Sequence, residues 1–182
     1  MADPKVPYPS PLFVILPWEE VAGEHGFDPR SPYVERFWLG TLGPSTTFLL
    51  RHLVGGLDVW PEGYELDLPA TAAALGLTSL GPQGAFARAL QRLVQFGLAH
   101  PHGHGLVVRR VVPPLSARHV AKLPPHLQDE HRRWLAAGSD PRVADRARLL
   151  AHALRAAGAD RRAVAVELEV LGIPRAIARQ AA

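Results

Sequence analysis

A group of arginine and glutamine side chains shares one face of a helix predicted over residues 85–98. Its members are Arg88, Gln91, Arg92 and Gln95. At about 100° per residue these positions point one way, and a set of apolar positions points the other. The apolar positions are Phe86, Leu90, Leu93 and Gly97. Arginine and glutamine can make paired hydrogen bonds to the major-groove edges of guanine and adenine. Both are also good helix formers, so an ordinary solvated face is the alternative.

Two further arginines, Arg109 and Arg110, lie in a β-rich run predicted over residues 106–112. Adjacent residues of a strand point to opposite sides, so at most one of the two faces a given surface. An exposed arginine on such a strand can contact a phosphate group, which positions a nucleic acid without reading its sequence. These two residues complete the predicted DNA-binding set.

Three histidines alternate in the segment before this run, and alternating residues of a strand share one face. In that geometry His100, His102 and His104 could chelate zinc, copper or nickel. Pro101 and Gly103 separate them, however, and no nearby carboxylate completes a coordination shell. The chain has no cysteine, which excludes thiolate ligands. We therefore expect an exposed turn, with no metal site and no cofactor.

The elements around these residues follow a recognisable order. Residues 64–112 predict a short strand, a helix, a turn, the 85–98 helix and two strands around a Gly/His-rich tip. The segments LPATAAALGL and FARALQRLVQFGLAH, with the strand pair after them, resemble the winged helix-turn-helix superfamily, in particular its bacterial regulators and replication proteins. The resemblance implies that the polar face of the 85–98 helix enters the major groove, and that Arg109, Arg110 or both contact the backbone. The connection over residues 78–84 is longer than the tight turn of that motif.

The charge distribution favours a polyanionic partner. The net charge is −4 over residues 1–63, +4 over residues 64–139 and +3 over residues 140–182. No aspartate or glutamate occurs between Asp67 and Asp129, an interval that contains all six predicted DNA-binding residues. A sustained basic segment of this kind is typical of a nucleic-acid-binding surface. The alternative is a chance gap in a region rich in alanine and proline.

The chain divides into three predicted parts. Residues 1–32 form an extended proline-rich N-terminal arm, in which residues 12–16 are an edge strand or cross the core. Residues 33–137 form the winged-helix domain, and residues 138–182 form a small C-terminal helical region. The predicted fold class is mainly α with a small β-hairpin. No apolar run approaches the roughly 20 residues that span a bilayer, so we expect no membrane partner. The absence of cysteine suits a reducing compartment, and we expect a cytoplasmic protein.

We expect no enzymatic activity, because the sequence lacks a phosphate-binding loop, an HExxH motif and a Gly-x-Ser-x-Gly elbow. The leading hypothesis is a transcriptional regulator that binds double-stranded DNA, as a homodimer because one recognition helix reads few base pairs. The alternative is a protein–protein interaction module that uses the same scaffold, holds a partner through the N-terminal arm or C-terminal helices, and binds no DNA. A third hypothesis is a ligand- or metal-responsive sensor. It would require a binding pocket or a complete set of metal ligands, and the sequence indicates neither.

Overall fold

The computed structural model describes residues 6–8, 12–19, 26–77, 81–137, 141–171, 173 and 175–182. The fold divides into two compact units, Met1–His119 (unit 1) and Val120–Ala182 (unit 2). This division falls before the boundary at residues 137–138 that the sequence suggested. No helix among the described residues has the length and apolar character needed to cross a membrane.

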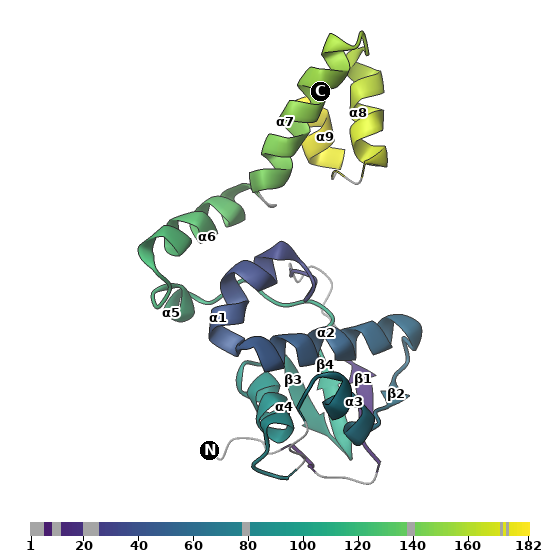
Figure 1. The fold of residues 1–182 in the computed structure, drawn as a ribbon, viewed down its shortest axis with the longest axis vertical. Helices are drawn as coiled ribbons and strands as arrows, with labels where there is room; N and C mark the ends of the chain where they lie inside the picture. Colours follow the sequence, from purple (N-terminus) through teal and green to yellow (C-terminus); the bar gives the residue numbers. More distant parts are fainter. Residues whose placement is uncertain are drawn as a thin grey trace. The chain divides into compact units, whose positions relative to one another are not determined.

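The described chain is mainly helical and contains one mixed sheet in unit 1 (Figure 1). In spatial order its strands are β2 (Tyr64–Glu65), β1 (Val14–Pro17), β4 (Gly105–Val108) and β3 (Ala99–His102). β3 and β4 pair antiparallel and form the predicted hairpin. The hairpin therefore belongs to a larger sheet than the sequence predicted.

Strand β1 lies inside the sheet, antiparallel to β2 and parallel to β4. The expectation of an edge strand for residues 12–16 is therefore wrong. Its physical basis was the lack of an N–H group in proline, but Pro17 is the last residue of the strand and leaves the preceding donors intact. The side chain of Ile15 is 0% exposed, so β1 contributes to the core as well as to the hydrogen-bonded sheet.

Helix α2 (Pro44–Val59) runs along the core and continues through Gly55 and Gly56, although glycine commonly ends a helix. Its buried side chains are Thr46, Thr47, Leu49, Leu50, Leu53, Val54 and Leu57. Gly56 gives room to the ring of Tyr64, whose hydroxyl donates to the carbonyl of Leu53 at 3.0 Å. Burial raises the pKa of Tyr64 to about 12. The glycine therefore serves packing rather than helix termination.

A wide helical turn, η1 (Val34–Trp38), and the short helix α1 (Leu39–Leu42) precede α2. The ring of Tyr33 stacks on that of Phe27 with centroids 3.6 Å apart, and its hydroxyl accepts from the backbone N–H of Leu115 at 2.8 Å. The indole N–H of Trp38 donates to the carbonyl of Pro113 at 3.0 Å. These contacts fasten the segment after β4 to the start of the helical layer.

Helices α3 (Leu68–Ala74) and α4 (Ala85–Gln95) match two predicted helices, with α4 ending before the predicted residue 98. The Asp67 carboxylate caps α3 by accepting from the N–H of Ala70 at 2.9 Å. Gly76 follows it with φ +67°, the left-handed conformation that ends a helix. Residues 78–80 of the predicted long connection lie outside the described residues.

Unit 2 contains a small helical core. Its helices are α6 (Pro125–Ala137), α7 (Pro141–Ala156), α8 (Arg161–Val170) and α9 (Arg175–Ala181), while α5 (Ala117–Val120) spans the junction between the units. The buried residues of this core come from α7, α8, α9 and the segment between α8 and α9, and they are Ala147, Ala151, Val164, Leu168, Ile173 and Ala178. The Asp160 carboxylate caps α8 by accepting from the N–H of Ala163 at 2.8 Å, and Leu171 after this helix is 52% exposed. The sequence also offers Asp140 as a cap for the helix that follows it, but Asp140 lies outside the described residues.

Replacing Gly105 tests the position of β1. A Cβ atom at Gly105 would overlap the backbone of Val14, which cannot move without breaking the sheet. We predict that Gly105→Ala lowers the free energy of unfolding by about 1–3 kcal/mol, the cost of overpacking. Gly55→Ala is the matched control, because a Cβ atom there meets no atom within 4 Å and alanine favours a helix by about 1 kcal/mol. Equal denaturation midpoints for the two variants would contradict the pairing of β1 with β4.

Candidate nucleic-acid interface

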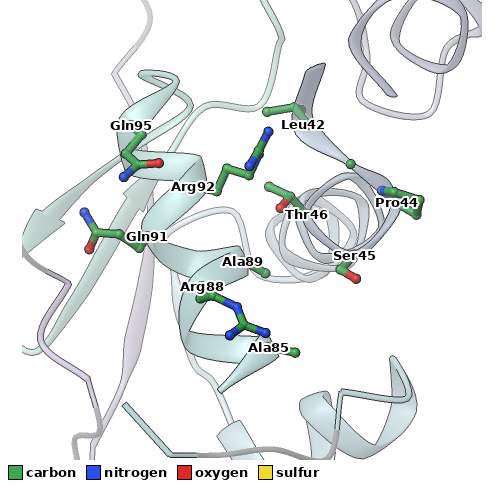
Figure 2. Close-up of a pocket in the computed structure, with 11 residues that line it drawn as sticks. Leu42, Pro44, Ser45, Thr46, Ala85, Arg88, Ala89, Gln91, Arg92 and Gln95 are labelled. Atoms are coloured by element: carbon green, nitrogen blue, oxygen red, sulfur yellow. The ribbon is translucent and has the colours of Figure 1, made fainter. Parts of the chain in front are cut away.

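The outer face of α4 and the start of α2 form the two sides of a groove of about 410 Å³ (Figure 2). The α4 side contains the predicted polar residues Arg88, Gln91, Arg92 and Gln95. The α2 side is lined by residues 42–46. The two arginines extend toward the α2 side, and the two glutamines lie on the other side of the same helix face (Figure 2). The structure therefore brings all four predicted helix residues to one surface.

Both arginines are held by backbone carbonyl groups, and no carboxylate of the described residues pairs with either of them. Arg88 donates from Nη1 to the carbonyl of Gln83 at 3.0 Å, and Arg92 donates from Nη2 to the carbonyl of Thr41 at 2.6 Å. The guanidinium of Arg92 also lies 5.4 Å from the centroid of the Phe96 ring. Within the described chain neither forms an ion pair. The contacts orient the guanidinium groups and leave donors for an anion.

The other side of the groove adds a second source of positive potential. Helix α2 begins there with Pro44 in its first turn, and no side chain caps its N-terminus. The N–H groups of a first helical turn have no partners within the helix, and they carry the positive end of the helix dipole. Arg88 and Arg92 therefore face a helix end of the same sign, an arrangement that favours an anion between them.

A short segment of the N-terminal arm contacts the glutamine side of α4. The backbone N–H of Val6 donates to Oε1 of Gln91 at 3.2 Å, and the ring of Tyr8 lies 6.1 Å from that of Phe86. Burial raises the pKa of Tyr8 above its ordinary value. Sequence patterns predicted an extended arm but not its position, since no local signal specifies a contact between residues 6 and 91. Both of these contacts of the described arm residues are with the glutamine side of α4 and the buried face behind it.

Arg109 and Arg110 follow β4 and do not line the groove. Arg109 donates from Nε to the carbonyl of Gly97 at 3.1 Å, and its guanidinium lies 4.3 Å from the Trp18 ring centroid. Arg110 forms an ion pair with Asp58 at 2.9 Å. The structure thus separates these two residues from the four on α4.

Asp58 is an acidic neighbour that the sequence analysis missed. Its carboxylate binds Arg30 at 2.7 Å as well as Arg110, and these hydrogen bonds, with that from Arg30 the larger influence, hold its pKa below the ordinary value. Asp58 is far from Arg110 in sequence, so the acid-free interval gave no sign of this pairing. The pair fixes Arg110 beside the end of α2.

The three histidines are divided between two environments. The ring of His100 packs edge-on against Trp18 with centroids 4.6 Å apart. His102 and His104 are exposed at the hairpin tip. Among the described residues, no group of three histidine, aspartate or glutamate side chains is arranged to hold a metal ion.

Comparison of the chain with protein-family models, curated proteins and solved structures gave no match. The geometry and charge of the groove are therefore the basis for a functional assignment.

A proline at position 6 tests the contact of the arm with α4. Val6→Pro removes the N–H group that donates to Gln91 but suits an extended segment, whereas Val6→Ala retains the donor. A hydrogen bond of this kind contributes about 0.5–1.5 kcal/mol, so the ratio of the bound to the unbound population of the arm should fall roughly two- to tenfold only in the proline variant. The intensity of the nuclear Overhauser effect between the Tyr8 and Phe86 rings measures that population. Equal intensities in the two variants would argue against the contact.

Proposed function

We propose that this chain binds double-stranded DNA through the outer face of α4. The observation that carries the proposal is the charge of the groove, where Arg88 and Arg92 are held by backbone carbonyl groups rather than by carboxylates. Arginine binds phosphate and guanine through planar, paired hydrogen bonds, so these two groups suit a nucleic acid. The uncapped start of α2 on the opposite side supports the same partner.

The order of elements supports a place for α4 in the major groove. The sequence α2, β2, α3, α4, β3, β4 resembles the winged helix-turn-helix order, in which the second helix of the motif reads base edges and the hairpin is the wing. In this proposal Gln91 and Gln95 contact bases, and Arg88 and Arg92 contact guanine or phosphate. Strand β1 is an addition to that arrangement.

The biological role we propose is that of a transcriptional regulator acting as a homodimer. One recognition helix contacts few base pairs, and a symmetric pair of helices would read two half-sites about 34–36 Å apart. In this proposal Arg109 and Arg110 contribute less to DNA binding than the residues of α4, because both already form contacts within unit 1. An exposed ion pair contributes at most about 1 kcal/mol, so a phosphate group can replace Asp58 as the partner of Arg110.

A protein–protein interaction module is the alternative function. It is favoured by large apolar side chains exposed on unit 2, where Leu149 is 74% exposed, Val166 56% and Val170 74%. Exposed apolar groups of this size are typical of protein contacts when they form a continuous patch. Recovery of one stoichiometric protein partner, with no affinity of the chain for DNA, would support this function over the first.

Removing the two groove arginines tests the DNA-binding proposal. We predict that Arg88→Ala combined with Arg92→Ala weakens binding to duplex DNA at least tenfold, because each paired hydrogen-bonding interaction with a base contributes about 1–3 kcal/mol. The slope of log affinity against log salt should fall by up to about 2, since each phosphate interaction contributes roughly 0.9. Fluorescence anisotropy at several salt concentrations measures both quantities.

The control variant combines Arg132→Ala with Arg148→Ala. It removes the same charge from exposed arginines that are paired with Asp129 and Asp145. Affinity should stay within about twofold of the unmodified chain. Unchanged binding by the Arg88→Ala/Arg92→Ala variant, or equal losses in both variants, would exclude α4 as the DNA-binding element.

A further inference from the structure

Unit 2 contains a basic hollow that takes no part in the proposed use of α4. Its volume is about 410 Å³, and it is lined by Arg161 and Arg162 from the first turn of α8 and by Arg179 from the last turn of α9. The remaining lining residues are Ala165 and Ala182, whose small side chains leave the space open. We call this site the arginine hollow.

The arginines of the hollow differ in their contacts from three other arginines of unit 2, namely Arg132, Arg148 and Arg155. Arg132 and Arg148 form ion pairs with aspartates three residues earlier, at 2.9 and 2.6 Å. Arg155 donates to the carbonyls of Ala181 and Ala182 at the end of α9, at 3.5 and 3.4 Å. Within the described residues, the three guanidinium groups of the hollow have neither a hydrogen bond nor an ion pair. Their donors therefore remain available to a ligand.

No aspartate or glutamate side chain lines the hollow. Asp160, next to Arg161, uses Oδ1 to cap α8 by accepting from the N–H of Ala163 at 2.8 Å. Three like charges around one space repel one another, and a bound anion converts that repulsion into attraction.

We propose that the arginine hollow binds a phosphate group. The tetrahedral oxygens of phosphate can accept from several guanidinium groups at once, and arginine is the side chain best suited to this planar, paired contact. The volume is in the range of small-ligand sites, so a phosphate with an attached sugar also fits. The phosphate is supplied either by the backbone of a nucleic acid or by a free phosphate compound. This site does not depend on DNA binding by α4.

The first experiment uses inorganic phosphate as the probe and the full chain as the protein. The test variant combines Arg161→Gln, Arg162→Gln and Arg179→Gln. The control combines Arg132→Gln, Arg146→Gln and Arg148→Gln, which removes the same charge from exposed positions of the same unit. Shifts of the arginine Nε–Hε signals are followed by NMR as chloride is replaced by phosphate at constant ionic strength. We expect saturable shifts in the unmodified chain and the control, and at least fivefold weaker binding in the test variant.

A second experiment distinguishes the two sources of phosphate by titrating the same proteins with duplex DNA. A nucleic-acid source predicts that the test variant reduces the salt slope by up to about 3, while the control leaves it near that of the unmodified chain. A free-phosphate source predicts the NMR response with equal DNA affinity in all three proteins. The Arg88→Ala/Arg92→Ala variant retains the phosphate response in either case, which separates this site from the α4 proposal. Absence of both responses, or equal losses in test and control variants, would overturn the proposal.

Discussion

Burial of one face of α4 is the interaction on which the arrangement of unit 1 depends. Phe86, Leu90 and Leu93 are 0% exposed, and each fully buried side chain of this size contributes about 1.5–3 kcal/mol. These positions pack against α2 and the sheet, so the positions between them must face solvent. The outward direction of Arg88 and Arg92 therefore follows from the core rather than from any contact of their own.

The placement of acidic residues determines which arginines keep an available charge. Asp58 engages both Arg30 and Arg110 beside the end of α2, while the groove at the start of α2 contains no acidic lining residue. The arginines near the two ends of α2 therefore differ in their interactions. At one end it forms ion pairs within the chain, and at the other it faces a helix N-terminus of like sign.

The features predicted from sequence were those governed by local patterns. The two faces of α4 depend on residues within a few positions of one another, and helical periodicity identifies them. Features set by distant contacts were missed. One example is the reason for a glycine at position 56 inside α2, because the ring of Tyr64, which fills the space there, comes from another element.

The same limit applies to the candidate site. The sequence identified the four polar residues of α4 as one surface, and the structure places them together. It gave no indication of the ion pair between Arg110 and Asp58, or of the contact between Val6 and Gln91, because each joins segments more than 50 residues apart. The interior position of β1 has the same origin, since its neighbours β2 and β4 come much later in the chain.

An NMR titration of the full chain with duplex DNA tests the central claim most directly. The side-chain amide signals of Gln91 and Gln95 and the Nε–Hε signals of Arg88 and Arg92 report on the outer face of α4, which is the surface proposed to bind. The account predicts that these signals shift together in a saturable and salt-sensitive manner. Saturable binding that shifts the signals of other residues and leaves all four of these side-chain signals unchanged would contradict the claim that α4 binds DNA.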